Sequence, residues 1–199
     1  MKYTMNNIEL YNELLKQGYI DYNNDNYIWI PEMEFLSPEK MIYRKNIYSE
    51  LLKVNDLNIF AINGGGDFFA WGKDEIVLFV EHETGNCSQF ALNLNDAIFR
   101  RIIEFTSGRY VDMCSNDQKS LMDEEDAEYY ISENDAITML NKYVETFGEY
   151  FSKDKINCIT KIAERGFYND YNAFITDEIL NKIVNDIVKI DKAIHNIAK

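Results

Sequence analysis

The stretch LNIFAINGGGDFFAW, residues 57–71, decides the fold class. Two short runs of aliphatic and aromatic residues, 57–62 and 68–71, flank a turn made of Asn63, three glycines and Asp67. Apolar runs joined by an Asn/Gly-rich turn are typical of a β-hairpin, because glycine adopts the positive φ angles of such turns without strain. The turn lacks GxGxxG spacing, a GK[ST] ending and a following helix, so we predict a hairpin and not a phosphate-binding loop.

Further strands and helices are predicted on both sides of this hairpin. Residues 27–30, 76–80 and 88–92 are rich in β-branched and aromatic residues, which favour strands. Residues 6–16 and a segment starting at Ser37-Pro38 have helical patterns or caps, and Asn95 is a candidate cap for a helix ending at Gly108. Short strands with flanking helices predict an α+β domain, an antiparallel sheet backed by helices.

The chain changes character after residue 110. Residues 112–135 are polar and acidic and predict a solvated loop, whereas three helices are expected beyond it, capped by Ser132, Ser152 and Thr176. In the third, isoleucines from Ile179 to Ile197 step by four or three, an apolar stripe that must be buried. We therefore predict an α+β domain at 1–110 and an acidic loop with a helical C-terminal extension at 111–199, packed on the same body. The alternative is that the apolar stripe is buried in a homodimer formed through residues 177–197.

Charge is the most informative feature of the composition. The 199 residues carry a net charge of −14, and of the 20 basic and 34 acidic residues, 12 and 27 lie in residues 1–152. Such a polyanion repels nucleic acid. The acidic excess either attracts cationic proteins or simply keeps the protein soluble, and the composition leaves both interpretations open. The three cysteines are scattered, which argues against a disulfide framework or a zinc site. With no signal peptide or membrane-spanning run expected, the prediction is a cytoplasmic protein without cofactor, direct nucleic-acid binding or membrane contact.

The candidate binding residues are carboxylates, and common catalytic motifs are missing from the sequence. There is no GxSxG, HExxH or SxxK sequence, so we expect no enzymatic activity. A hydrolase that uses His82, Glu83 and Asp67 is the less favoured alternative. The acidic run at 123–126 lacks the spacing of an EF-hand, which leaves a solvated loop or a protein-binding loop. The candidate partner-binding residues are Asp123, Glu124, Glu125, Asp126, Glu128, Glu81, Glu83 and Asp67.

The hairpin segment resembles the SUKH superfamily, also called SMI1/KNR4-like. The resemblance rests on the glycine-turn hairpin at 57–71, the strand at 76–80, the Glu81-His82-Glu83-Thr84-Gly85 turn and the helix from Asp96, and extends from about residue 27 to 108. It implies an antiparallel sheet backed by helices, and it carries over no catalytic residue.

The resemblance also implies a function. Most bacterial members are regarded as immunity proteins that neutralise a cognate toxin of a polymorphic or contact-dependent toxin system, and many such toxins are basic nucleases. We therefore expect a non-enzymatic immunity protein. An intracellular SMI1-type scaffold or regulatory protein is the alternative that the resemblance leaves open.

Overall fold

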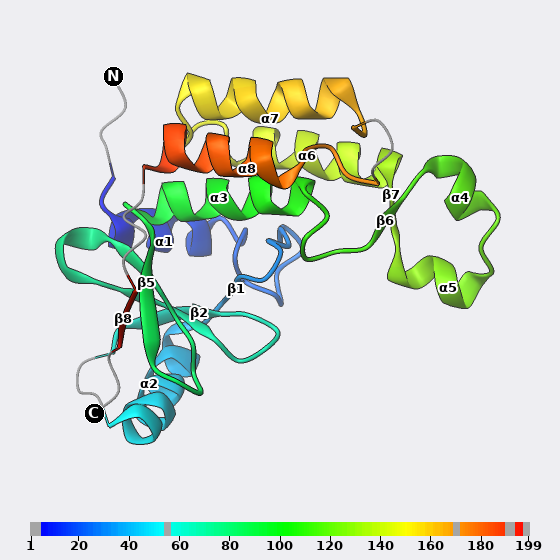
Figure 1. The fold of residues 1–199 in the computed structure, drawn as a ribbon. Helices are drawn as coiled ribbons and strands as arrows, with labels where there is room; N and C mark the ends of the chain where they lie inside the picture. The colour runs from blue at the N-terminus through cyan, green and yellow to red at the C-terminus, as the bar shows by residue number, and fades with distance from the viewer. Residues whose placement is uncertain (1–4, 54–56, 169–171, 190–193, 197–199) are drawn as a thin grey trace. The chain divides into compact units, whose positions relative to one another are not determined.

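The computed structural model describes residues 5–53, 57–168, 172–189 and the backbone of 194–196 (Figure 1). It confirms the predicted α+β class, an antiparallel sheet with helices. The chain divides into two compact units, the first formed by Met1–Ile98 with Val188–Lys199 and the second by Phe99–Ile187. The expected division after residue 110 falls inside the second of these units.

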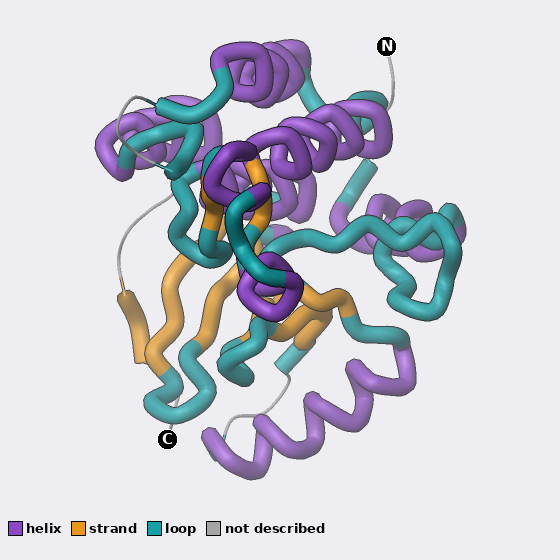
Figure 2. The backbone as a smooth tube through the Cα atoms, turned by 90° about the vertical axis from the view of Figure 1, so that its right-hand side faces the viewer, coloured by secondary structure: helices purple, strands orange, loops and turns teal. Residues whose placement is uncertain are grey.

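The first unit is built on a six-stranded antiparallel sheet, whose strands lie side by side in Figure 2. The predicted hairpin at its centre is confirmed: the N–H of Asn63 donates to the carbonyl of Asp67 at 2.9 Å, closing the glycine turn. In spatial order the strands are β1 (Glu34–Phe35), β2 (Ile59–Ile62), β3 (Phe68–Trp71), β4 (Val77–Val80), β5 (Asn86–Ala91) and β8 (Ile194–Asn196).

The two faces of this sheet carry different side chains. One face is mostly aliphatic and packs on the helix α2 (Pro38–Leu52) through Tyr48 and Leu52. The other is aromatic, with Phe69 5.3 Å from Phe79 and 5.1 Å from Phe90 between ring centroids. Both faces are therefore largely buried, which explains why these strands are apolar runs and do not alternate with polar residues.

Local capping places the helices of the first unit. Asn6 forms a capping box with Glu9 at the start of α1 (Asn7–Lys16), and Ser37 caps α2. The prediction that Asn95 caps the next helix is wrong. The side chain of Asn93 accepts from the N–H of Asp96 instead, so α3 (Leu94–Thr106) begins two residues earlier than expected.

The second unit is helical, and its acidic segment is not a loop. A parallel pair, β6 (Met113–Cys114) with β7 (Ile131–Ser132), brackets two short helices, α4 (Asn116–Ser120) and α5 (Glu124–Tyr129). Four further elements follow: α6 (Glu133–Phe147), α7 (Lys153–Arg165), α8 (Asp177–Ile183) and the π-helical turn η2 (Val184–Val188). Caps at Ser132, Ser152 and Thr176 are confirmed.

Two further predictions fail because backbone contacts override local patterns. Residues 27–30 form no strand, because the N–H of Ile28 donates to the carbonyl of Tyr19 and closes a loop. The first strand of the sheet is instead β1, which comes later in the chain and has only two residues. The isoleucine-rich helix also ends early, after which Lys189 takes a positive φ of 55°. Ile194 instead pairs with Ser88 at the edge of the sheet, while Ile190 and Ile197 lie outside the described residues. A continuous dimer helix over 177–197 is therefore not formed.

In the part of the chain that the structure describes, no helix combines the length and apolar character that crossing a bilayer requires.

Candidate functional site

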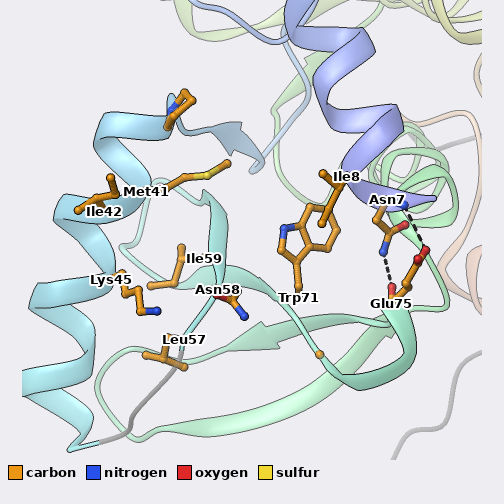
Figure 3. Close-up of a pocket in the computed structure, with 12 residues that line it drawn as sticks. Asn7, Ile8, Met41, Ile42, Lys45, Leu57, Asn58, Ile59, Trp71 and Glu75 are labelled. Carbon is orange, nitrogen blue, oxygen red and sulfur yellow. Dashed lines mark hydrogen bonds between the residues drawn. The ribbon is translucent and has the colours of Figure 1, made fainter. Parts of the chain in front are cut away.

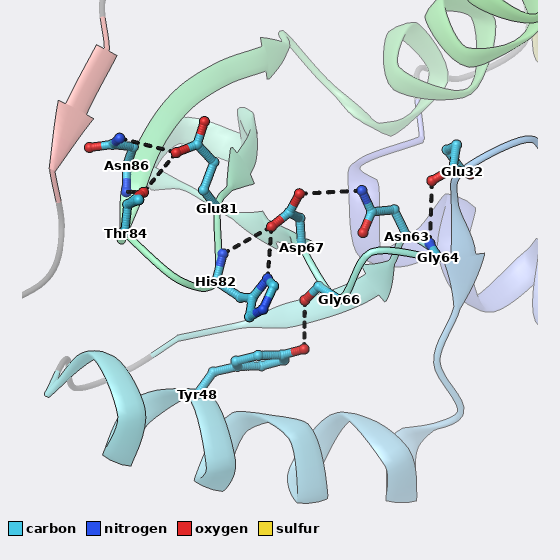
Figure 4. A network of polar contacts seen from close by, with 10 residues as sticks. All are labelled: Glu32, Tyr48, Asn63, Gly64, Gly66, Asp67, Glu81, His82, Thr84 and Asn86. Atoms are coloured by element: carbon cyan, nitrogen blue, oxygen red, sulfur yellow. Dashed lines mark hydrogen bonds and ion pairs between the residues drawn. The ribbon is translucent and has the colours of Figure 1, made fainter. Parts of the chain in front are cut away.

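Two turns at one end of the central sheet bring predicted site residues together (Figure 4). Asp67 directly precedes β3 and His82 follows β4, and the antiparallel register pairs Phe68 with Val80. The glycine turn and the 81–85 turn therefore lie side by side.

Asp67 and His82 form a hydrogen-bonded pair across the two turns. The Nδ1 of His82 lies 2.9 Å from Oδ1 of Asp67, and the His82 backbone N–H donates to the same oxygen at 3.1 Å. Asn63 donates from Nδ2 to Oδ2 of Asp67 at 3.4 Å. Partial burial alone raises the pKa of Asp67, but these hydrogen bonds outweigh it and hold the pKa below its ordinary value.

Tyr48 of α2 contacts the residues on both sides of Asp67. Its ring stacks on Phe68 at 4.6 Å, and its hydroxyl donates to the carbonyl of Gly66 at 2.6 Å. Gly66 has a φ of 91°, and a Cβ there would lie 3.4 Å from the His82 ring. A residue other than glycine would be strained in this turn, so the glycine run fixes the position of Asp67 against His82.

The two glutamates of the second turn behave differently. The carboxylate of Glu81 accepts from the hydroxyl of Thr84 at 2.7 Å and from the amide of Asn86 at 3.0 Å, which stiffens the turn. Glu83 is exposed on the same turn. Asp67 and His82 therefore form one polar cluster, Glu81 forms another with Thr84 and Asn86, and Glu83 lies exposed between them in the sequence.

In many hydrolytic sites a histidine acts as the general base and a carboxylate orients its ring. The His82–Asp67 pair has this geometry. A hydrolytic site would also need a nucleophile within reach of the ring. The hydroxyls of Tyr48 and Thr84, both drawn in Figure 4, donate to Gly66 and Glu81 respectively and to neither member of the pair. Among the described residues, no group of three or more His, Cys, Asp or Glu side chains could hold a metal ion.

The second group of predicted residues lies on α5, in the helical unit. Asp123 is the N-cap, accepting from the N–H of Asp126 at 2.9 Å, and the acidic first turn lies at the positive end of the helix dipole. These carboxylates are therefore favourable to the helix at its start. Glu124 and Glu128 are four residues apart and repel each other at a cost of roughly 0.2–0.5 kcal/mol.

The side chains of α5 and of the residues beside it are strongly exposed to solvent. All five predicted carboxylates, from Asp123 to Glu128, are exposed. Leu121 before the helix is 87% exposed and Tyr129 at its end is 72% exposed. Exposed apolar side chains with polar residues around them are a feature of protein-binding surfaces.

Sequence reasoning missed an apolar cleft at the other end of the β2–β3 hairpin, between α1 and α2. It has a volume of about 610 Å³. The available signal was in α2, where apolar residues such as Ile42, Tyr43, Ile47 and Leu51 occupy more than one side of the helix and stay exposed.

No family model, curated protein or solved structure matches this chain.

Proposed function

We propose that this chain is a non-enzymatic immunity protein of the SUKH type, which binds and neutralises a cognate basic toxin, most simply a nuclease. The observation that carries the proposal is the exposed acidic helix α5 with its flanking apolar residues Leu121 and Tyr129. A nuclease presents cationic charge to hold its substrate, and a surface of this kind complements that charge.

The charge distribution supports the same partner. No basic residue occurs from 123 to 135, and the chain carries a net charge of −14. Electrostatic attraction of this strength increases the association rate and makes it sensitive to salt. Asp67 and Glu81, in the two turns at one end of the sheet, add a second, smaller group of acidic side chains in the sheet unit.

The test is a pull-down with the product of the neighbouring gene, followed by rescue of its toxicity by co-expression. The proposal expects a complex that forms at low salt and cells that survive only when this chain is present. A neighbouring product that is harmless and does not bind would leave the SMI1-type scaffold as the better interpretation.

One observation keeps the hydrolase alternative in view, namely the 2.9 Å contact between His82 and Asp67. Glu83, its third proposed member, is an exposed residue of the turn. Substrate turnover by purified protein that is lost in His82→Ala, while toxin binding persists, would favour the hydrolase.

A further inference from the structure

The apolar cleft lies where β2 begins and β3 ends, the end of the hairpin opposite the glycine turn (Figure 3). Its volume of about 610 Å³ falls within the range of small-molecule sites, roughly 300–1,000 Å³. One wall comes from α2, one from Ile8 of α1, and the floor from the strand ends. The apolar lining side chains are Ile8, Pro38, Met41, Ile42, Leu57, Ile59 and Trp71.

The floor of the cleft is rigid. Trp71 is stacked on Phe60, with ring centroids 3.8 Å apart and planes inclined by 14°, and its backbone N–H donates to the carbonyl of Asn58 at 2.9 Å. Asn7, the first residue of α1, donates two hydrogen bonds to Glu75, one from its backbone N–H and one from its side-chain amide. The site is therefore preformed, which reduces the entropic cost of filling it.

The mouth of the cleft is apolar and open to solvent. Ile8 is 64% exposed and Ile42 is 65% exposed, one on each wall. Within α2 the buried residues, Tyr48 and Leu52, lie in its second half, whereas its first half contributes Pro38, Met41 and Ile42 to the lining of the cleft. An apolar molecule between these walls would remove both isoleucines from water.

The charges of the lining select the ligand class. Lys45 is the only basic side chain among the described residues that line the cleft, and it extends from α2 toward the strand side (Figure 3). Glu75, the one acidic residue among the described lining residues, lies on the opposite side of the cleft from Lys45 in Figure 3, where it accepts from the N–H of Asn7 at 3.1 Å. We propose that this cleft binds an amphipathic organic anion, its apolar body against Trp71 and Ile59 and its anionic group beside Lys45.

The cleft belongs to the sheet unit, whereas the proposed toxin contact on α5 belongs to the helical unit. The helix α2 carries three basic residues, Lys40, Arg44 and Lys45, and two acidic ones, Glu39 and Glu50, so it does not favour a cationic protein. The inference therefore stands or falls independently of the proposed function.

The test uses two fluorescent probes of nearly the same shape. 1-Anilinonaphthalene-8-sulfonate carries an anionic group, and N-phenyl-1-naphthylamine lacks it. We expect one sulfonate probe to bind per chain, about fivefold more tightly than the neutral probe. This ratio of affinities is what one partly exposed ion pair contributes. Dodecanoate, a non-fluorescent amphipathic anion, should displace it.

Two matched pairs of variants locate the site. Lys45→Gln should remove the preference for the sulfonate probe, whereas Lys40→Gln on the same helix should leave it within twofold. Ile42→Glu places a carboxylate at the mouth and should weaken the sulfonate probe at least tenfold. Tyr43→Glu, its neighbour with 64% exposure outside the lining, should have little effect. Circular dichroism verifies that all four variants fold.

Several results would overturn the proposal. These are no probe binding up to 1 mM, equal loss in Ile42→Glu and Tyr43→Glu, or a sulfonate preference that survives in Lys45→Gln. Displacement of the probe by a protein partner but not by dodecanoate would assign the cleft to an apolar side chain of that partner.

Discussion

Tyr11 is a single residue that makes the stability of the sheet unit sensitive to alkaline pH. Its ring is buried and its hydroxyl donates to the carbonyl of Leu36 at 2.5 Å. Burial, with a smaller contribution from the charge of Asp21, raises the pKa of Tyr11 to about 12. Because the folded-state pKa is raised, the stabilisation is complete below the unfolded value, near 10, and is lost as the pH rises through the folded value.

We therefore expect the free energy of unfolding to fall between pH 10 and pH 12, by an amount on the order of 2–3 kcal/mol from this residue. Tyr11→Phe should be less stable at pH 7 by about 1 kcal/mol but should lose less stability over that interval. Urea unfolding at a series of pH values measures both. Parallel curves for the two proteins above pH 10 would contradict the assignment.

Asp67 gives the opposite pH dependence. Its pKa is held below the ordinary carboxyl value by the His82 hydrogen bonds, so its contribution is present above about pH 4 and is lost as the pH falls through the folded-state value. Asp67→Asn should flatten the loss of stability below pH 4. Asp67→Ala should cost about 1–3 kcal/mol at pH 7, because the backbone N–H of His82 loses its acceptor. Unfolding curves with the same acid limb as the wild type would show that the pair is not formed in solution.

At the scale of elements, Asn7 connects three of them. It is buried, its backbone N–H donates to Glu75, the last residue of η1 (Lys73–Glu75), and its Oδ1 accepts from the N–H of Leu94 at the start of α3 at 2.8 Å. Asn7→Leu should cost about 2–4 kcal/mol, because the Leu94 N–H would be left without its acceptor in an apolar environment. Asn12→Leu, on the exposed side of α1, is the control. Denaturant midpoints that fall equally in both variants would argue against the connection.

Elements determined by local chemistry could be predicted from the sequence. The glycine-turn hairpin and the caps at Ser37, Ser132, Ser152 and Thr176 depend on residues within a few positions of one another. Elements determined by distant backbone partners could not. The strand β8 forms on the free edge of β5, about 100 residues earlier in the chain, where a helical pattern predicted otherwise.

The candidate site residues likewise include some that could be predicted from the sequence and some that could not. The carboxylates of α5 are contiguous in the sequence, so their grouping was predictable, although their helix was not: Asp123 caps a turn that composition alone suggested was a loop. The contact of His82 with Asp67 depends on the β3–β4 register, and the cleft at Trp71 depends on how far α2 stands from the strands. Neither distance is encoded in a local pattern.

At the scale of the whole molecule, the excess negative charge is the basis of the proposed function. The structure also determines which substitutions can test it. Reversal of Asp123 would remove the cap of α5 and confuse loss of charge with loss of the helix, whereas Glu124 and Glu128 are exposed and do not cap. Glu124 contributes to the helix only as a charge in its first turn, about 0.3–1 kcal/mol. Glu145 and Glu164, exposed on α6 and α7 of the same unit, provide a control with the same change in net charge.

The most direct measurement is the association rate constant for the toxin partner at 20 mM and 500 mM salt. The double variant Glu124→Lys/Glu128→Lys should associate about tenfold more slowly than wild type at low salt, and the two should converge at high salt, where charges are screened. The control Glu145→Lys/Glu164→Lys should stay within about threefold of wild type, because its charges lie outside the contact. Equal slowing by both pairs, or a rate for the α5 variant that matches wild type at low salt, would contradict the account.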